Sequence, residues 1–352
     1  MQPAPPVRSK RQAHAKGDAM SETPELPAAS EASATRAQSL AKAVTEGVSS
    51  VIVGKAEQIR LLLVALISEG HVLIDDVPGV AKTLLVRTMA AVLGLNFSRI
   101  QCTPDLLPSD VTGSEIFNQK TGEFEFRRGP VFANLVLADE INRATPRAQS
   151  SFLEAMEERQ VTIDGMPNPL PRPFLVLATQ NPVELRGTFP LPEAQLDRFL
   201  LRLRMGYPNA AEEVRILQRF RAADPFADVL PVADAAQVTA AGAEARRVHV
   251  SPDLDAYIVD LVRATRESEP TTLGASPRAA LQLLHAAQAA AAIDGRDFVV
   301  PDDIVTLAPA VLAHRLILSR SAQAERLSPE TVVENILDGL RVPVESPPDE
   351  RP

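Results

Sequence analysis

The spacing of apolar residues divides the chain into two parts. Between residues 40 and 206, short apolar runs alternate with longer segments in which apolar residues recur every three or four positions. The short runs are typical of strands covered on both faces of a parallel sheet, and the longer segments are typical of helices. The runs predict strands at residues 71–74, 97–102, 134–140, 174–179 and 200–203, and the longer segments predict helices at 43–50, 55–68, 83–93 and 148–158. We therefore expect an α/β domain in this part.

Two segments of the first part are expected to form β-hairpins. Residues 115–127 alternate in polarity around a Lys-Thr-Gly turn at residues 120–122, and the segment that begins at Val161 turns at an Asp-Gly pair at residues 164–165. Turn-forming residues between two such segments are the usual signal of a hairpin.

Beyond Tyr207 the pattern predicts helices alone. Three of them begin with a serine followed by a proline, at Ser251, Ser276 and Ser328. A serine N-cap with proline at the first helical position is a frequent helix start. Helices are predicted at residues 209–220, 252–266, 277–293, 301–318 and 329–340, with Pro309 dividing the fourth and a looser connection at 224–247. An all-α domain is therefore expected at residues 207–342.

Composition narrows the classes of protein. The net charge is −9 and the pI is near 5.2, whereas nucleic-acid and membrane-surface binders usually carry a basic excess. No apolar run reaches the roughly 18 residues that span a bilayer. The single cysteine, Cys102, excludes an intramolecular disulfide and favours a reducing compartment, so a cytoplasmic location is expected. Residues 1–39 and 343–352 are too polar to bury a core and are expected to be disordered, with the true start at Met1 or Met20.

The stretch from 71 to 93 carries the signal of a phosphate-binding loop. A predicted strand turns through Gly79 into a helix that opens with Lys82 and Thr83. Free N–H groups at a helix N-terminus attract an anion, a lysine there can reach a terminal phosphate, and the hydroxyl can bind Mg²⁺. The strict pattern has glycine where this chain has Asp76 and Ala81. An ordinary strand-turn-helix junction with a surface lysine is the alternative.

Polar residues follow two later strands. Asp139 and Glu140 end the run at 134–140, and Asn181 follows the run at 174–179. Ligands of parallel sheets gather at the carboxyl ends of the strands, so Asp139 is expected to face the metal held by Thr83 and Glu140 to orient water. Asn181 is placed to bond a phosphate or that water. The alternatives are a solvated strand end for the acidic pair and a simple Asn-Pro turn.

Four further residues have two interpretations each. Val53 and Gly54 precede the phosphate loop and could line an adenine pocket or pack as ordinary core. Arg198 could pair with Asp197 or reach the nucleotide of a neighbouring subunit. Arg278 lies in the first turn of a helix, where the dipole disfavours a cation, so an anionic partner or simple exposure would explain it.

Together these features resemble the MoxR family of AAA+ ATPases. The resemblance depends on VPGVAKT, LVLADEINRATPRAQSSFLEAMEERQVTIDG, LATQNP and GTFPLPEAQLDRF in this order, and it covers residues 53–204 well. It implies an AAA+ P-loop domain layered αβα over residues 40–206 and a helical lid at 207–342. The hairpin at 115–127 is similar to the helix-2 insert of this clade. Family loops usually have glycine at the position of Ala81.

The resemblance also implies roles for single residues. It makes Lys82 and Thr83 Walker A residues, Asp139 and Glu140 Walker B residues, Asn181 sensor 1, Arg198 the arginine finger and Arg278 sensor 2. The nucleotide is expected to contact Val53, Gly54, Val77, Pro78, Gly79, Val80, Ala81, Lys82, Thr83, Leu84 and Asp139. Arg143 and Arg147 are the alternative arginine fingers.

The implied activity is ATP hydrolysis with Mg²⁺ by a homo-oligomer, expected to be a hexamer. For this family the resemblance implies a chaperone-like remodeller of partner proteins, often proteins with a von Willebrand factor A domain. Two other functions remain open: a nucleic-acid-stimulated motor, which the acidic balance disfavours, and a regulatory scaffold that binds ATP without hydrolysing it, which Glu140 disfavours.

Overall fold

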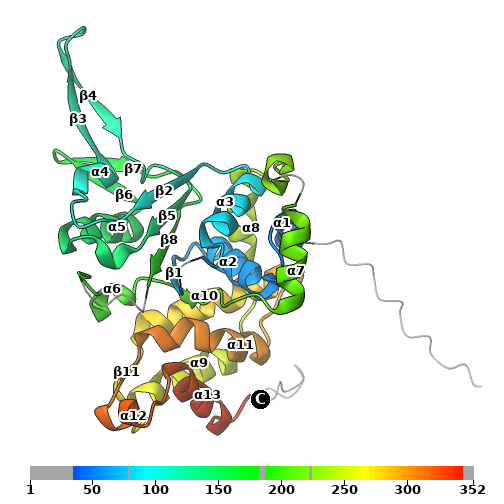
Figure 1. Ribbon diagram of the computed structural model, residues 1–352. Coiled ribbons are helices and arrows are strands. Elements are labelled where there is room, and N and C mark those ends of the chain that lie inside the picture. The colour runs from blue at the N-terminus through cyan, green and yellow to red at the C-terminus, as the bar shows by residue number, and fades with distance from the viewer. Residues whose placement is uncertain (1–34, 78, 182–186, 222–223, 344–352) are drawn as a thin grey trace, which may run out of the picture. The chain divides into compact units, whose positions relative to one another are not determined.

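The sheet of the first part is parallel, as the sequence predicts. The computed structural model describes residues 35–77, 79–181, 187–221 and 224–343. All five strands run in the same direction in the order β2-β5-β8-β1-β9 (Figure 1). The strands are β1 (Val72–Asp75), β2 (Phe97–Gln101), β5 (Leu135–Asp139), β8 (Leu175–Gln180) and β9 (Leu201–Leu203).

Helices cover both faces of this sheet. Along β5, Leu135 and Leu137 belong to one hydrophobic cluster, while Val136 and Ala138 belong to another. Alternate residues of a strand point to opposite faces, so two clusters on one strand mean that both faces are buried. The first cluster includes α2 (Ala56–Ile67) and α3 (Lys82–Val92), and the second includes α5 (Pro146–Glu158). The expected αβα layering is confirmed.

The first helix, α1 (Arg36–Ser49), begins earlier than the predicted 43–50 and lies partly in the predicted tail. The Thr35 hydroxyl caps it by accepting a hydrogen bond from Gln38 N at 3.1 Å, and Ala37 is fully buried. The small side chain of Ala37 carries little hydrophobic signal in the sequence, although it packs closely in the structure. The remaining residues of both predicted tails, 1–34 and 344–352, lie outside the described residues.

Both predicted hairpins are confirmed. The first pairs β3 (Gly113–Asn118) with β4 (Glu123–Arg128), and the second pairs β6 (Gln160–Ile163) with β7 (Met166–Pro169). Figure 1 shows that β3 and β4 project beyond the sheet. The short elements are α4 (Pro108–Thr112), η1 (Ile141–Arg143), α6 (Glu193–Leu196), η2 (Pro225–Asp228), η3 (Ala313–Arg315) and α12 (Arg320–Ala324).

The serine caps of the second part are confirmed. Ser251, Ser276 and Ser328 each accept a hydrogen bond from the backbone of the helix that they cap. These helices are α9 (Pro252–Glu267), α10 (Pro277–Ile293) and α13 (Pro329–Gly339), and α7 (Ala210–Arg219) has the predicted Asn209 cap.

Three expectations about this part are wrong. The supposed loose connection contains α8 (Ala235–Ala245), whose Val238 and Ala241 are buried. Pro309 does not split α11 (Pro301–Leu312), because it lies near the end of the helix and the buried face of α11 offsets a cost of about 3 kcal/mol for a proline in a helix interior. The part is also not purely helical, since β10 (Thr271–Leu273) and β11 (Ile317–Leu318) form a two-stranded antiparallel sheet.

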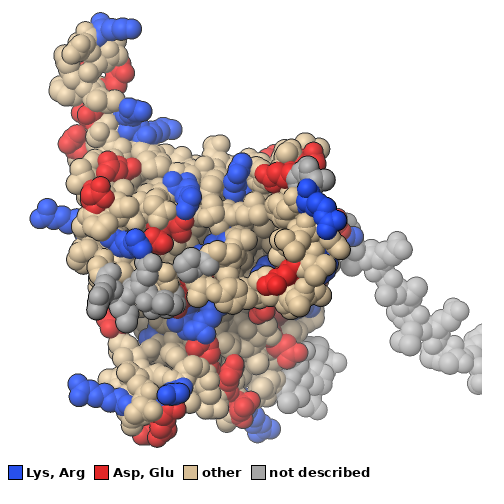
Figure 2. All heavy atoms as spheres, viewed as in Figure 1, with Lys and Arg blue, Asp and Glu red and all other residues tan. Residues whose placement is uncertain are grey.

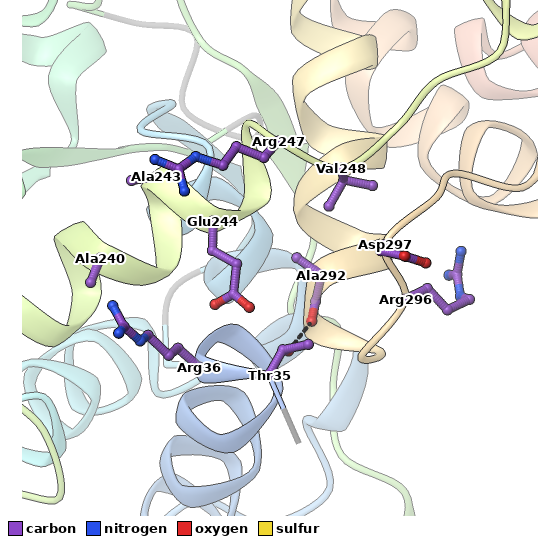
Figure 3. Close-up of a pocket in the computed structure, with 10 residues that line it drawn as sticks. All are labelled: Thr35, Arg36, Ala240, Ala243, Glu244, Arg247, Val248, Ala292, Arg296 and Asp297. Atoms are coloured by element: carbon purple, nitrogen blue, oxygen red, sulfur yellow. Dashed lines mark hydrogen bonds between the residues drawn. The ribbon is translucent and has the colours of Figure 1, made fainter. Parts of the chain in front are cut away.

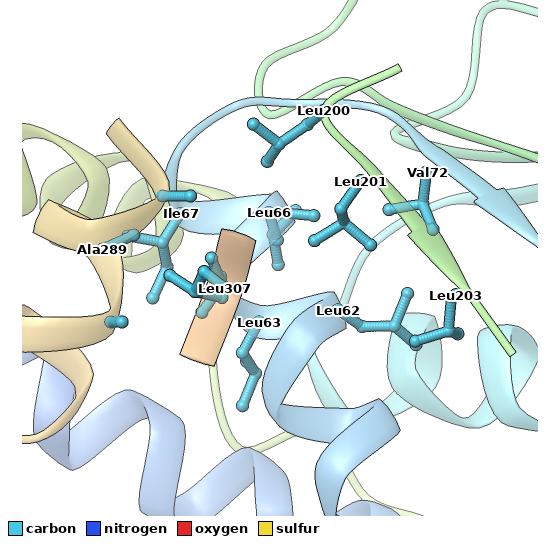
Figure 4. Packing of buried hydrophobic residues seen from close by; sticks show 14 of the residues in the cluster. Leu62, Leu63, Leu66, Ile67, Val72, Leu200, Leu201, Leu203, Ala289 and Leu307 are labelled. Atoms are coloured by element: carbon cyan, nitrogen blue, oxygen red, sulfur yellow. The ribbon is translucent and has the colours of Figure 1, made fainter. Parts of the chain in front are cut away.

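One hydrophobic core joins the sheet to the C-terminal helices. Helix α2 is buried along most of its length, and its Leu62, Leu66 and Ile67 share a cluster with residues of β1 and β9 and with Ala289 and Leu307 of the lid (Figure 4). A movement of the C-terminal helices would therefore displace closely packed side chains that also contact the sheet. No helix among the described residues is long and apolar enough to cross a bilayer.

Two histidines are buried in neutral form. The Nδ1 atom of His71 accepts from Val176 N at 3.0 Å, and its Nε2 atom lies 3.1 Å from Met156 O. Burial and, to a smaller extent, the nearby Arg159 together lower the pKa of His71 to about 3. Burial likewise lowers the pKa of His314, whose Nε2 atom lies 3.1 Å from Phe199 O.

Acid should therefore destabilise the fold. The unfolded chain binds a proton at His71 below pH 6.5 whereas the folded chain does not, so the free energy of unfolding falls as the pH drops from 6.5 towards 3. Between pH 7 and 5 the loss from His71 is about 2 kcal/mol. In urea denaturation, His71→Gln should reduce this pH dependence, and His249→Gln, at an exposed histidine, should keep the wild-type dependence. Equal pH dependence in all three proteins would contradict the account.

Candidate functional site

The loop between β1 and α3 opens into a pocket of about 500 Å³. Gly79 has φ +86°, a conformation that glycine adopts without strain, and the space where a side chain would lie is open. The free N–H groups of the first turn of α3 face this region, so it is suited to a phosphate. The pocket is lined by Gly79, Ala81, Lys82, Thr83, Leu84, Arg99, Gln101, Asp139, Glu140, Thr179, Gln180 and Asn181.

The departure from the strict pattern at Asp76 has a structural role. Its Oδ2 atom accepts from the backbone N–H groups of Met205 and Gly206, at 2.5 and 2.7 Å, and its Oδ1 atom accepts from Val77 N at 2.7 Å. Asp76 is buried and is not among the residues that line the pocket. The carboxylate therefore points away from the phosphate region and fixes the chain after β9. Lys82 Nζ donates to the Asp76 carbonyl at 3.0 Å, which holds the lysine in the loop.

The second departure, at Ala81, places a side chain in the left-handed region. Ala81 has φ 59° and ψ 25° and immediately precedes α3. This conformation costs a residue other than glycine roughly 1–2 kcal/mol of conformational free energy. The alanine is small and exposed, so the loop keeps its shape at the cost of local strain.

Ala81→Gly should relieve this strain. We expect the free energy of unfolding to rise by about 1 kcal/mol, with unchanged or tighter binding of ATP, because glycine adopts positive φ without penalty. The same substitution in the interior of α3, Ala90→Gly, should lower the free energy of unfolding by about 1 kcal/mol or more. Thermal unfolding of both variants checks the pair, and destabilisation by Ala81→Gly would contradict the assigned strain.

Thr179 joins the two acidic residues predicted at the end of β5. Its hydroxyl donates to Asp139 Oδ1 at 2.7 Å and accepts from Glu140 N at 2.8 Å. Glu140 itself has φ 57° and ψ 51°, so the chain turns sharply after Asp139 and both side chains reach the pocket. The sequence analysis missed Thr179. The signal was its position two residues before Asn181, because residues two apart on a strand share a face.

Two residues of β2 complete the polar wall and were also missed. Arg99 donates to Asp139 Oδ2 through Nη2 at 2.6 Å, and Gln101 Nε2 donates to Glu140 Oε2 at 3.2 Å. Gln101 lies opposite Asp139 in the parallel pairing of β2 with β5. The Asp139 and Glu140 carboxylates are thus each held by a side chain of the adjoining strand β2. The signal in the sequence was the polar pair two residues apart near the end of β2.

A smaller pocket of about 310 Å³ lies beside the phosphate loop. It is mainly apolar, which suits a purine base. Its lining comprises Val51, Ile52, Val53, Lys55, Gly79, Val80, Ala81, Leu84, Met205, Pro208, Ile216 and Phe220. Val53, which the sequence analysis placed either beside an adenine or in ordinary core, is one of the residues that line this pocket.

Two predicted nucleotide contacts among the described residues, Gly54 and Val77, are not in either pocket lining. A Cβ atom at Gly54 would lie 2.0 Å from Glu212 Oε1 of α7. The backbone at Gly54 therefore packs too closely against this side chain to leave room for a larger residue. Val77 is partly buried and packs against the main core. Pro78 lies outside the described residues.

The two predicted long-range arginines meet at one glutamate. Arg198 Nε lies 3.2 Å from Glu157 Oε2, and Arg278 Nη2 lies 2.6 Å from Glu157 Oε1. Neither arginine is among the residues that line the phosphate pocket or the smaller apolar pocket of its own chain. Asp197 does not pair with Arg198, because it is bound by Arg315 instead. The sequence could not show that a lid helix approaches α5.

The alternative arginines lie elsewhere. Arg143 Nε pairs with Glu140 Oε2 at 3.1 Å, so it acts on the pocket of its own chain. Arg147 is exposed in the first turn of α5.

A pocket of about 490 Å³ lies between α1, α8 and the end of α10 (Figure 3). Its charged groups have both signs, and Glu244 Oε2 accepts from Ala37 N at 3.2 Å to hold the start of α1. The Thr35 hydroxyl donates to Ala292 O at 3.3 Å. These contacts join helices, and the pocket contains none of the predicted nucleotide residues.

The donor set of the phosphate pocket fits magnesium bound with a nucleotide. Thr83 offers a hydroxyl and Asp139 a carboxylate in one pocket. Within the described ranges, no group of three or more His, Cys, Asp or Glu side chains could hold a metal ion. Because Mg²⁺ is usually bound by one or two carboxylates together with phosphate oxygens and water, this small donor set is sufficient.

Comparison with known proteins agrees with this geometry. Residues 71–201 match the ATPase family associated with various cellular activities (AAA), and residues 263–336 match the AAA lid domain. The chain is 50% identical over 306 residues to the uncharacterised protein YeaC of Bacillus subtilis (strain 168), covering 87% of this chain and 95% of YeaC. It is 44% identical over 327 residues to chaperone MoxR1 of Mycobacterium tuberculosis, covering 90% of this chain and 86% of MoxR1.

A solved structure has the same architecture. The crystal structure of a candidate ATPase from Cytophaga hutchinsonii superposes with a TM-score of 0.83 at 42% sequence identity, covering 88% of this chain and 96% of that protein. The agreement extends over the sheet and the C-terminal helices together.

Proposed function

Since the chain belongs to the MoxR family of AAA+ ATPases, we propose that it hydrolyses ATP with Mg²⁺ and uses the energy to remodel partner proteins. The observation that carries this proposal is one pocket in which Lys82 and Thr83 face Asp139 and Glu140. A loop that only bound phosphate would not need the second acidic residue.

Each residue of the pocket has a distinct part in the proposed reaction. Lys82 neutralises the β- and γ-phosphates, while Thr83 and Asp139 would hold the metal. When bound, Mg²⁺ neutralises charge on the phosphate oxygens. Arg99 and Thr179 hold the Asp139 carboxylate in a fixed orientation.

Glu140 and Asn181 act on the attacking water in this proposal. The Glu140 carboxylate is held by Gln101 and Arg143, so it is oriented before the substrate arrives. Asn181 is buried and lines the same pocket, where its amide can bond the water or the γ-phosphate.

Arg198 and Arg278 act on a neighbouring copy. Both pair with Glu157, and neither lines the phosphate pocket of its own chain. A guanidinium supplied by a second subunit can stabilise the transferring phosphate. This arrangement requires a homo-oligomer, and we propose a hexameric ring.

The proposed clients are proteins with a von Willebrand factor A domain in the cytoplasm. Support comes from the chaperone name of the relative MoxR1 and from the resemblance of this chain to the family. A Glu140→Gln variant loaded with ATP should retain such a client during purification.

A nucleic-acid motor is less well supported. On the face shown in Figure 2, basic and acidic side chains are interspersed, and the chain has a net charge of −9. Strong binding to phosphate backbones needs clustered basic side chains. Stimulation of ATP hydrolysis by DNA, but not by a client protein, would favour the motor.

Mixing two variants tests the exchange of arginines. Copies with Arg198→Ala and Arg278→Ala keep an intact pocket but should hydrolyse ATP slowly alone. Copies with Glu140→Gln should not hydrolyse ATP but can donate both arginines. Mixing them should raise phosphate release by about 10-fold or more, because an arginine donated in trans contributes at least that much in related phosphoryl transfers. Additive rates in the mixture would contradict the proposal.

A further inference from the structure

A polar cluster lies behind the two arginines, where the first part of the chain meets the lid. Asp197 immediately precedes Arg198, and Ser276 lies two residues before Arg278. The Ser276 hydroxyl lies 2.9 Å from both carboxylate oxygens of Asp197. One carboxylate therefore connects the segment that carries Arg198 to the helix that carries Arg278.

Arg315 holds this carboxylate in place. Its Nε atom donates to Asp197 Oδ1 at 2.9 Å, and its side chain is only 2% exposed. It also donates to the carbonyl groups of Phe199, Leu200 and Val311 and to Gln282 Oε1. Burial lowers the pKa of Arg315 to about 10, which leaves the guanidinium protonated at neutral pH. A buried cation fixed by this many acceptors is rigid.

Next to this cluster, both arginines bind one carboxylate, that of Glu157. Arg198 and Arg278 share the Glu157 carboxylate, and Arg198 Nη1 also donates to Leu153 O at 3.0 Å. Their side chains are 33% and 40% exposed, so they are accessible to an outside ligand. Their convergence on Glu157 therefore depends on the relative position of the two elements that carry them.

We propose that Asp197 and Ser276 are positioning residues that hold Arg198 and Arg278 together as one unit for the triphosphate of a neighbouring copy. This role rests on the proposed exchange of arginines between copies. Loss of the bond would let the N-terminus of α10 move independently of the segment before β9. A displacement of about 1 Å from the reacting group can lower a rate by about 100-fold.

Ser276→Ala removes the bond, and the chain offers a matched control. Ser251 also caps a lid helix ahead of a proline, and its hydroxyl accepts from the third residue of that helix at 3.3 Å, the same distance as for Ser276. Ser251→Ala thus removes a cap of the same kind without touching Asp197. Ser276→Thr keeps the hydroxyl and should restore the bond.

The test adds each substitution to Glu140→Gln donors and mixes them with Arg198→Ala, Arg278→Ala acceptors. Phosphate release is followed as the donor concentration increases. The concentration for half-maximal stimulation reports assembly, and the plateau reports how well the arginines act. We expect Ser276→Ala donors to lower the plateau about 10-fold or more with an unchanged half-maximal concentration. Ser251→Ala and Ser276→Thr donors should keep the plateau.

Two results would overturn the positioning role. An unchanged plateau with Ser276→Ala donors would show that the bond does not place the arginines. An equal fall with Ser276→Ala and Ser251→Ala donors would show that only the helix cap matters. If donors with Glu140→Gln alone fail to stimulate the acceptors, the exchange of arginines itself is wrong, and the positioning role falls with it.

Discussion

Glu140→Gln is expected to abolish turnover while leaving ATP binding intact. The glutamine has nearly the same shape and can still accept the hydrogen bond that Gln101 donates to Glu140 Oε2. It cannot accept a proton from water, and general-base catalysis contributes about 10²–10⁴-fold to such reactions. The rate of phosphate release under single-turnover conditions should fall by that factor.

Glu154→Gln, at an exposed glutamate of α5, is the control for this variant. It removes one negative charge from the same part of the chain and should keep wild-type turnover. A wild-type rate in Glu140→Gln would instead support a scaffold that binds ATP without using this carboxylate.

Lys82→Ala is expected to abolish nucleotide binding. The Lys82 ammonium lines the phosphate pocket and is held 3.0 Å from the Asp76 carbonyl, so it is already oriented towards an incoming phosphate. Hydrogen bonds to charged groups contribute about 1.5–3 kcal/mol each. Loss of two such bonds would weaken ATP binding by about 100-fold or more.

Calorimetric titration with ATP and Mg²⁺ measures this loss. Lys42→Ala removes an exposed lysine from α1 and should bind like the wild type. Both variants should unfold at the wild-type temperature without nucleotide, since neither lysine is part of a core. Wild-type affinity in Lys82→Ala would refute the assignment of the loop.

Local patterns predicted much of the fold. The strand runs were covered on both faces, as β5 shows with Leu135 and Val136 in different clusters. The serine caps predicted the starts of α9, α10 and α13 because capping depends on neighbours along the chain. The start of α1 and the existence of α8 depend on contacts between distant segments. Both segments are rich in alanine, which is only weakly apolar, so the hydrophobic pattern did not predict these contacts.

The pocket was predicted better than its surroundings. Lys82, Thr83, Asp139, Glu140 and Asn181 lie together because the carboxyl ends of parallel strands meet at one edge. The orientation of Asp76 depends on backbone N–H groups far along the chain, at Met205 and Gly206. The meeting of Arg198 and Arg278 at Glu157 depends on the packing of the lid, which no sequence spacing encodes.

The central claim is that one nucleotide binds where β1 turns into α3. Titration of the Glu140→Gln protein with ATP and Mg²⁺ tests it most directly, because bound ATP is not consumed during the measurement. The account predicts saturable binding of one ATP per chain that the added Lys82→Ala substitution removes. Absence of saturable binding, or binding that survives Lys82→Ala, would contradict it.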